Sequence, residues 1–204
     1  MNVFARSIFL LVAAAAFTSC SEKIAANSAA PSSSSGNPRS SATVGMERPL
    51  ILTPDEGEQR AWRPLTTKGR KRTLQAFTIK VDRQNGGSPQ LWFGTSTIPV
   101  GAGINAHRHL DQDEMLYIVS GSAQVHVGSL DKVARTGSIV FIPRNTWISL
   151  KNIGSTPISL LFGFNAPGFD AFMRCESVPL GKPAPPMSET EDAHCIKLGD
   201  VQYR

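Results

Sequence analysis

Hydrophobic and polar residues alternate with a period of two along most of the chain after Thr73. The apolar runs are rich in Val, Ile, Phe, Leu and Thr and are separated by Gly, Pro, Asn or Asp. They read TLQAFTIKV, LWFGTSTIPV, EMLYIVSG, AQVHVG, SIVFIP, TWISLKN and PISLLFGF. Each run is typical of a short strand, because successive side chains of a strand point to opposite faces. Seven or more such strands, with no alternation of strands and helices, predict an all-β antiparallel sandwich or small barrel.

Two segments interrupt this pattern after the last apolar run. APGFDAFMRC, residues 166–175, predicts a short helix, since Pro167 suits a first helical turn. Residues 179–194 contain too many prolines for a central strand and predict a loop that wraps the barrel. We therefore expect a barrel over about residues 73–164, followed by a short helix and a proline-rich tail.

The first nineteen residues have the pattern of a secretory signal. Arg6 precedes an apolar run, residues 7–17, that is too short to span a membrane. Residues 17–20, FTSC, resemble a bacterial lipobox, in which Cys20 becomes the lipidated first residue of the mature chain. The alternative is ordinary secretion, with cleavage near Ala25 and Ala26. We expect residues 1–19 to be a signal peptide.

The residue after Cys20 is Ser21, which would send a lipoprotein of a Gram-negative cell to the outer membrane, facing the periplasm. Without lipidation the protein would be soluble in the periplasm or secreted. Residues 20–46 are rich in Ser, Ala, Asn, Gly and Pro and have no hydrophobic period, which predicts a flexible tether. The remaining residues, 47–204, are a normal size for one domain.

The net charge is +5, or +4 once Arg6 is removed with the signal. Basic residues are concentrated in KGRKR, residues 68–72. Export and the lack of an aromatic or helical recognition element argue against nucleic acid as a partner. The segment is expected to be a solvated loop, with contact to anionic lipid or another anion as the alternative.

The chain has three cysteines. If Cys20 carries lipid, Cys175 and Cys195 remain as one candidate pair. A bridge between them would stabilise an exported domain by about 3 kcal/mol through restriction of the unfolded chain. The alternative is a pair of separate thiols.

Candidate chemistry lies in residues 101–121, GAGINAHRHLDQDEMLYIVSG. His107 and His109 are two apart and share one face of a strand. A polar turn follows, and the next strand can return Glu114 to the same point. Two imidazoles and a carboxylate suit Zn, Fe, Mn, Ni or Cu, with coordination positions left open. The alternative is a salt bridge or a surface pair, but a glutamate that opens so apolar a strand is costly to bury without a partner.

This stretch resembles the first cupin motif, G-x5-H-x-H-x4-E-x6-G, at Gly101, His107, His109, Glu114 and Gly121. Downstream, residues 137–152 resemble the second motif, G-x5-P-x-G-x2-H-x3-N, at Gly137, Pro143 and Asn152. The likeness extends over about residues 91–164 and is greatest to small single-domain cupins of the quercetin-dioxygenase-like group. It implies a cupin jelly roll, an antiparallel double-stranded β-helix barrel. The family includes dioxygenases, decarboxylases, isomerases and proteins that bind without catalysis, so the fold does not choose among them. A homodimer is expected from the likeness.

Two departures from the second motif bear on the site. Asn145 replaces a glycine, which is tolerable because Asn adopts left-handed turn geometry. Ile148 replaces the fourth metal-binding histidine and cannot ligate. One reading is a three-ligand centre similar to the two-histidine, one-carboxylate arrangement of non-haem iron oxygenases, with Glu114 also able to move a proton. The other is a pocket that has lost its metal and binds a small ligand.

The remaining candidate residues surround this site. His126 and His194 are expected to lie on the surface. Six aromatic residues spread over the strands are expected to be mostly core, and some to line a pocket for an aromatic or apolar small molecule; they are Phe93, Tyr117, Phe141, Trp147, Phe162 and Phe164.

Overall fold

The computed structural model describes residues 48–66, 76–86 and 88–204, all within a compact unit, Ser41–Arg204. The predictions for the signal peptide, Cys20, the tether and residues 68–72 concern residues outside these ranges.

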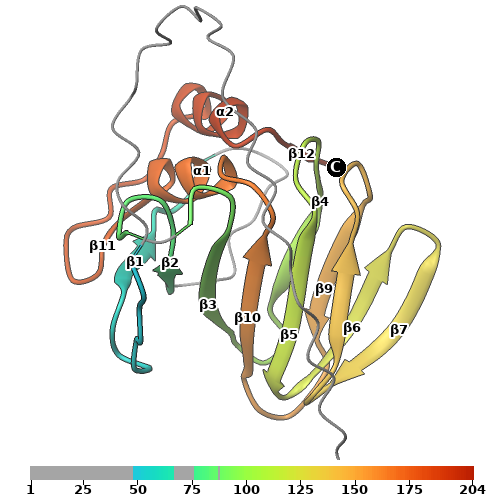
Figure 1. The fold of residues 1–204 in the computed structure, drawn as a ribbon. Coiled ribbons are helices and arrows are strands. Elements are labelled where there is room, and N and C mark those ends of the chain that lie inside the picture. The colour runs from blue at the N-terminus through green and yellow to red at the C-terminus, as the bar shows by residue number, and fades with distance from the viewer. Residues whose placement is uncertain (1–47, 67–75, 87) are drawn as a thin grey trace, which may run out of the picture. The chain divides into compact units, whose positions relative to one another are not determined.

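Two antiparallel sheets form the barrel (Figure 1). The strands of the larger sheet are β1 Glu58–Trp62, β2 Ala76–Val81, β3 Trp92–Ile98, β5 Glu114–Ser120, β8 Ile139–Ile142, β10 Ile158–Phe164 and β11 Ser177–Pro179. Their order is β11-β1-β2-β3-β10-β5-β8. The smaller sheet contains β4 Gly103–His109, β6 Ser122–Val127, β7 Leu130–Arg135, β9 Ile148–Asn152 and β12 Val201–Tyr203, in the order β12-β4-β9-β6-β7. The predicted all-β antiparallel barrel is confirmed.

Period-two alternation places the core between the two sheets. On β5, Leu116 and Ile118 are buried, whereas the intervening Tyr117 is partly exposed. The same alternation buries Ile98 on β3 and Leu160 on β10. Val125 and Leu150 of the smaller sheet belong to the same buried cluster, so the inward residues of both sheets form one apolar core.

Several strands carry no clear signal in the sequence. β7 buries only Ala134 among its six residues, because it lies at the edge of the smaller sheet. β11 and β12 are three residues long, and β1 has a mixed burial pattern. A strand that packs one side chain or fewer into the core leaves no period to detect.

Helix α1, Phe169–Cys175, lies where a short helix was predicted, but Pro167 precedes its first turn. The helix begins after Gly168, whose φ of 139° favours glycine. A Cβ atom at Gly168 would lie 2.4 Å from the amide nitrogen of Gln112. That amide donates to the carbonyl of Pro167 at 3.2 Å. Gln112 thus fixes the turn that leads into α1.

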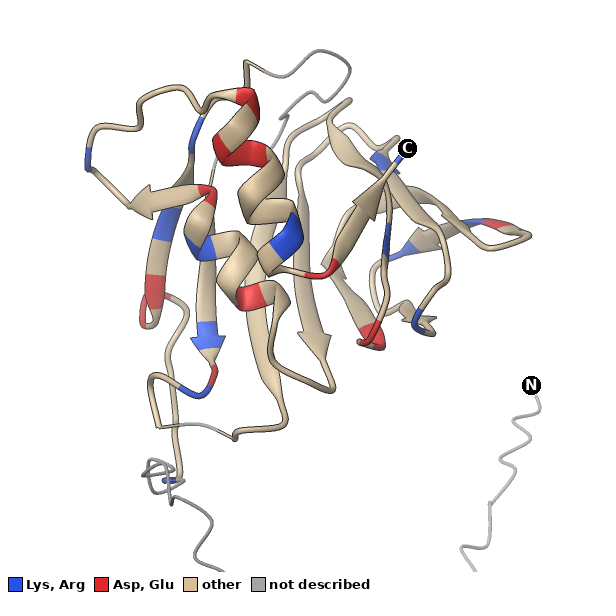
Figure 2. Cartoon of the chain, turned by 90° about the horizontal axis from the view of Figure 1, so that it is seen from above, with Lys and Arg blue, Asp and Glu red and all other residues tan. Residues whose placement is uncertain are grey.

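The prediction of a loop over residues 179–194 is wrong from Glu189 onward. Helix α2, Glu189–Leu198, begins there with a capping box, in which the Ser188 hydroxyl accepts from the backbone N–H of Glu191 and the Glu191 carboxylate accepts from that of Ser188. Figure 2 shows the acidic residues gathered at the start of this helix, where the helix dipole favours negative charge. No described helix is long and apolar enough to cross a lipid bilayer.

Covalent and ionic contacts tie the two helices to each other and α1 to the larger sheet. A disulfide joins Cys175, the last residue of α1, to Cys195 in α2, with the Cα atoms 5.5 Å apart. The Arg174 guanidinium donates to Glu58 on β1 at 2.6 Å and also to the buried carboxylate of Asp82. These contacts hold α1 against the ends of β1 and β2, as Figure 1 shows.

The second-motif residues shape the turns around β9. Asn145 adopts the left-handed conformation, with φ of 63°, as expected from its replacement of glycine. Its N–H donates to the carbonyl of His109 at 2.7 Å, which ties this turn to β4. Asn152 is buried and donates to the carbonyls of Ile98 and Thr156 at 3.0 and 2.9 Å, so it joins the end of β9 to β3 and to the next turn.

Candidate metal centre

His107 and His109 lie on β4 and point into the barrel. Their exposed fractions are 4% and 2%, and their ring centroids are 5.0 Å apart. Arg108 between them points away and donates to Gln202 on β12. The two imidazoles share the inner face, as the spacing predicts.

Glu114 is the first residue of β5, and hydrogen bonds to the carboxylate of Asp113 hold the turn before it. The carboxylate of Asp113 accepts from the backbone and guanidinium N–H groups of Arg144 at 2.9 and 3.1 Å and from the amide of Asn165 at 2.7 Å. These hydrogen bonds lower the pKa of Asp113, so the clamp persists at neutral pH. The chain is thereby turned so that Glu114 enters the barrel beside the histidines.

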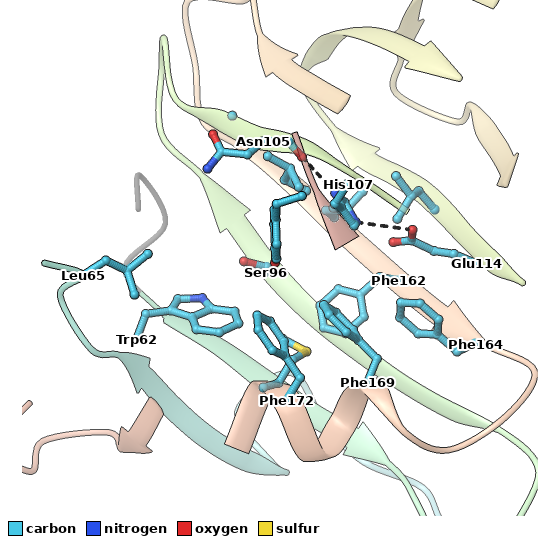
Figure 3. Close-up of a pocket in the computed structure, with 16 residues that line it drawn as sticks. Trp62, Leu65, Ser96, Asn105, His107, Glu114, Phe162, Phe164, Phe169 and Phe172 are labelled. Carbon is cyan, nitrogen blue, oxygen red and sulfur yellow. Dashed lines mark hydrogen bonds and ion pairs between the residues drawn. The ribbon is translucent and has the colours of Figure 1, made fainter. Parts of the chain in front are cut away.

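The three side chains converge on one point (Figure 3). The Oε2 atom of Glu114 lies 3.5 Å from Nε2 of His109 and 3.9 Å from Nε2 of His107. One ligand atom from each residue falls within 4.8 Å of the others. This is the cluster that the first motif predicted.

Hydrogen bonds orient the donors. Nδ1 of His107 lies 2.8 Å from the carbonyl of Asn105. A carbonyl only accepts, so this nitrogen carries the proton, and in the neutral ring Nε2 keeps the lone pair that can bind a cation. Both nitrogens of His109 and Oε2 of Glu114 are buried without a hydrogen-bond partner. The 3.5 Å between Nε2 of His109 and Oε2 of Glu114 is too long for a good hydrogen bond. Buried orphan atoms of this kind fit a bound cation.

The carboxylate of Glu114 is in its charged form near neutral pH. Burial raises its pKa, but the neighbouring imidazoles of His109 and His107 favour the ionised carboxylate and outweigh burial, so the pKa lies below its ordinary value. An ionised carboxylate and neutral imidazole nitrogens are the forms that bind metal.

The position of the fourth family ligand is apolar. Ile148 on β9 lies directly opposite His107 in the β4–β9 ladder and is 2% exposed. Residues opposite each other share a face, so the isoleucine side chain stands beside the imidazole without a donor atom. Neither remaining histidine replaces it, because His126 is exposed and contacts Asp131 at 3.4 Å, and His194 is exposed on α2.

A cavity of about 110 Å³ opens beside the cluster. Its wall is aromatic, with Trp62, Phe162, Phe164, Phe169, Phe172 and Tyr203 (Figure 3). Ser96 and Asn105 add polar atoms, and Glu114 is the one carboxylate that the described residues contribute to the wall. No Lys or Arg lines the cavity in the part of the chain that the structure describes.

Four aromatic wall residues were not anticipated from the sequence, namely Trp62, Phe169, Phe172 and Tyr203. Phe169 and Tyr203 lie nearest the histidines. The ring of Phe169 in α1 lies 4.4 Å from that of His109. Tyr203 on β12 pairs with His107 in the ladder, with ring centroids 5.8 Å apart. Both come from segments after the barrel, and only the tertiary fold brings them to β4.

The aromatic residues predicted to be core divide into three groups. Phe162 and Phe164 line the cavity, and Phe93 is half-buried. Trp147 lies beneath the guanidinium groups of Arg108 and Arg204. The prediction is wrong for Tyr117 and Phe141, which are 36% and 62% exposed, because each lies one position out of phase with the inward residues of its strand.

The comparison with protein families agrees with this geometry. Residues 94–164 match the family model described as Cupin domain, a range that contains His107, His109, Glu114 and the second motif. The fold is a cupin jelly roll. The match supports the cupin superfamily, and the quercetin-dioxygenase-like type is a finer assignment than it carries.

Similar proteins were found among curated sequences and solved structures. Uncharacterized protein MJ1618 of Methanocaldococcus jannaschii is 28% identical over 64 residues, which is 31% of this chain and 51% of that protein. The chain therefore spans about half the length of the curated relative it matches.

Three solved structures are also similar. A predicted oxalate decarboxylase from Thermotoga maritima is 19% identical, with a TM-score of 0.49, over 58% of this chain and all of that one. The Cnp3 cupin domain of Schizosaccharomyces pombe is 20% identical, with a TM-score of 0.42, over 48% of this chain and 67% of that one. A recombinant oxalate oxidase in complex with glycolate is 20% identical, with a TM-score of 0.42, over 50% of this chain and 57% of that one.

Proposed function

We propose that the cupin domain binds one divalent transition metal, Fe, Mn, Ni, Zn or Cu, through His107, His109 and Glu114. The observation that carries this proposal is the convergence of three buried donors, whose ligand atoms lie within 4.8 Å of one another. The orphan atoms of His109 and Glu114 support it, because a cation would satisfy them.

We propose that the site acts as a dioxygenase-like oxidoreductase on a small molecule. A metal bound there would supply Lewis-acid or redox chemistry at its open coordination positions. Asn105 holds His107 in the tautomer that offers Nε2. Glu114 can take up a proton at Oε1 while Oε2 faces the imidazoles, and the rings of Phe164 and Phe169 exclude water from the cluster.

The cavity favours a neutral aromatic or apolar substrate. Its wall is mostly aromatic, and a dianion such as oxalate would meet the carboxylate of Glu114 with no lining Lys or Arg among the described residues. An aromatic ring carrying a hydroxyl group would stack on the wall and direct its oxygen toward the donors. The names of the oxalate-related structures are therefore not carried over to this chain.

A non-catalytic ligand-binding domain is the second candidate. The observation that favours it is Ile148, which removes one donor and makes the barrel wall beside His107 apolar. In this case the same aromatic cavity would hold a small apolar ligand without turnover.

We also propose that the protein is exported, with residues 1–19 as signal peptide and Cys20 lipidated, and that it faces the periplasm from the outer membrane. The Cys175–Cys195 disulfide supports export, since such bonds persist in oxidising compartments. A soluble periplasmic or secreted form is the alternative. Mass spectrometry of the mature N-terminus separates the two.

Elemental analysis of the purified protein tests the metal proposal. We expect about one transition metal per chain in the natural protein, and loss of that metal in His107→Ala. His126→Ala is the matched control, because His126 is exposed on β6 of the same sheet as β4 and should leave the metal content unchanged. Equal metal content in all three proteins would contradict the site.

Oxygen uptake with flavonoid and catechol-like substrates then separates the two functions. Uptake that depends on both metal and substrate supports the oxidoreductase. Tight binding of the same compounds by metal-free protein, without uptake, supports the ligand-binding domain.

A further inference from the structure

Part of the cavity wall comes from segments outside the residues that match the cupin family. That match spans residues 94–164. Six described lining residues lie before or after it; they are Trp62, Leu65, Phe169, Phe172, Met173 and Tyr203. Figure 3 shows Phe169 and Phe172 on α1, across the cavity from Asn105 and His107. The matched range supplies the metal donors, whereas the added segments limit the space in front of them.

The aromatic rings of the added segments form one row that starts at the donors. The ring of Phe169 lies 4.4 Å from that of His109, and Phe172 stacks on Phe169 at 4.8 Å. The ring of Trp62 follows at 6.3 Å from that of Phe172. The cavity thus has a polar end at the donors and an apolar end at the indole of Trp62.

The larger sheet supports the apolar end of this row. Trp62 is the last residue of β1, and its ring lies 4.5 Å from that of Phe77 on β2. Phe77 is 3% exposed and belongs to the packed core, which leaves the indole little room to move away from the cavity. A ligand held at the donors would therefore meet a fixed apolar stop at Trp62.

Covalent and ionic contacts fix α1, which carries Phe169 and Phe172. The Cys175–Cys195 disulfide joins the end of α1 to α2. The guanidinium of Arg174 contacts the carboxylates of Glu58 and Asp82, which lie on and beside the strands of the larger sheet. An outward shift of α1 would break these ion pairs, one of which involves a fully buried carboxylate, so the wall resists expansion.

Hydrogen bonds on both sides of Tyr203 fix β12 against β4. Gln202 accepts from two guanidinium nitrogens of Arg108, at 2.9 and 2.7 Å. The backbone N–H of Arg204 donates to the carbonyl of Ala106 at 3.1 Å. The phenol ring of Tyr203 is therefore held in the wall by its two neighbours in the chain.

The space between these walls is small. Its volume is about 110 Å³. An engineered apolar cavity of about 150 Å³ holds benzene, so the space in front of the donors has room for one ring with small substituents. The linked rings of a flavonoid exceed it, and their entry would require a packed aromatic side chain to move.

We propose that this cavity selects single-ring phenols, such as catechol, over molecules with two or more rings, and that Trp62, Phe169 and Phe172 set the size limit. The inference rests on the proposed function, since both candidate functions place a small aromatic or apolar molecule in this cavity. The hydroxyl groups of the phenol face the donors, because the other end of the cavity is apolar. Its ring stacks on the row of aromatic side chains.

Calorimetric titration of the purified full chain with catechol, naphthol and quercetin tests the size limit. We expect the natural protein to bind catechol at least about tenfold more tightly than naphthol or quercetin. Trp62→Leu shortens the end wall and keeps an apolar side chain there, so it should raise the affinity for naphthol relative to catechol by about tenfold. Phe172→Leu should shift the ratio in the same direction.

Trp147→Leu is the matched control for Trp62→Leu. Trp147 lies beneath the guanidinium groups of Arg108 and Arg204 and does not line the cavity, so its loss should leave the ratio of the naphthol and catechol affinities unchanged. Melting temperatures show whether each variant is folded. Because Trp62 and Phe172 lie on different elements, either folded variant suffices for the test.

Three outcomes overturn the inference. They are quercetin binding as tight as catechol binding in the natural protein, no binding of any of the three compounds, and an unchanged affinity ratio in a folded Trp62→Leu or Phe172→Leu protein. Metal analysis of the same samples separates this inference from the metal proposal. A metal-free natural protein that still prefers catechol contradicts the metal centre and supports the size limit, whereas a metal-loaded protein without that preference does the reverse.

Discussion

The inner and outer faces of β5 carry similar apolar side chains but differ in how deeply these side chains are buried. Leu116 and Ile118 face inward and are 1% and 0% exposed, while Met115, Tyr117 and Val119 face outward and are 36–46% exposed. Both rows are apolar, and a one-residue shift would exchange them. Hydrophobic composition therefore does not identify the core of this barrel, because position within the strand period decides which row is buried.

The largest expected effect separates the two faces directly. Leu116→Ala should lower the free energy of unfolding by about 2–5 kcal/mol, because it leaves a cavity in a packed core. Met115→Ala, its outward neighbour, should cost about 0.5 kcal/mol or less in the monomer. Urea unfolding at low protein concentration checks both. Equal losses would mean that the outer face is as tightly packed as the inner one.

The disulfide between the two helices gives the next effect. Replacing both Cys175 and Cys195 by Ser should cost about 3 kcal/mol, since the bridge closes a loop with a sequence separation of 20 residues. Because α1 carries Phe169 and Phe172 of the cavity wall, the loss should also weaken ligand binding inside the barrel. Unfolding curves and ligand titrations of the double variant measure these two quantities. Unchanged ligand binding in a folded double variant would contradict the role of the bridge in holding the cavity wall.

The next prediction adds a metal ligand to the inner face. Ile148→His places an imidazole opposite His107, where the family motif has its fourth ligand, and should tighten metal binding about tenfold or more, equivalent to about 1.4 kcal/mol. Ile139→His is the matched control, because Ile139 is exposed on the outer face. Competition with a chelator of known affinity measures both. No gain for residue 148 would contradict its placement at the centre.

The smallest effect concerns an exposed carboxylate. Hydrogen bonds from the Ser188 backbone and hydroxyl, together with Arg63, lower the pKa of Glu191 to about 2 from its ordinary 4.5. The pKa is lowered in the folded state, so the stabilisation is fully present above the ordinary value and is lost as the pH falls toward about 2. Glu191→Gln should therefore be less stable than the natural protein at neutral pH, and the difference should shrink below about pH 4.5.

Urea unfolding across this range measures the difference. Glu189→Gln removes a negative charge from the same helical turn while leaving the capping box between Ser188 and Glu191 intact, and so serves as the control. A difference that grows on acidification would contradict the sign of the pKa shift.

The sequence by itself determined the inner face of the site. A period of two places His107 and His109 on one side of a strand, and the first-motif spacing returns Glu114 to them, because these relations are local and are set by strand geometry. The exposed positions of His126 and His194, and the left-handed turn at Asn145, were also predictable from near neighbours.

Only the tertiary structure decided what surrounds the donors and which apolar rows remain uncovered. β12 is three residues long and pairs with β4 across more than ninety positions of sequence, so Tyr203 has no local signal that places it beside His107. Tyr117 and Phe141 are large aromatic residues of the kind that core positions often hold. They face outward because the pairing of the strands decides which alternate side chains point away from the core. Local periodicity specifies the face of a strand, whereas long-range pairing specifies its neighbours, and the neighbours decide both which residues form the cavity wall and which apolar side chains stay exposed.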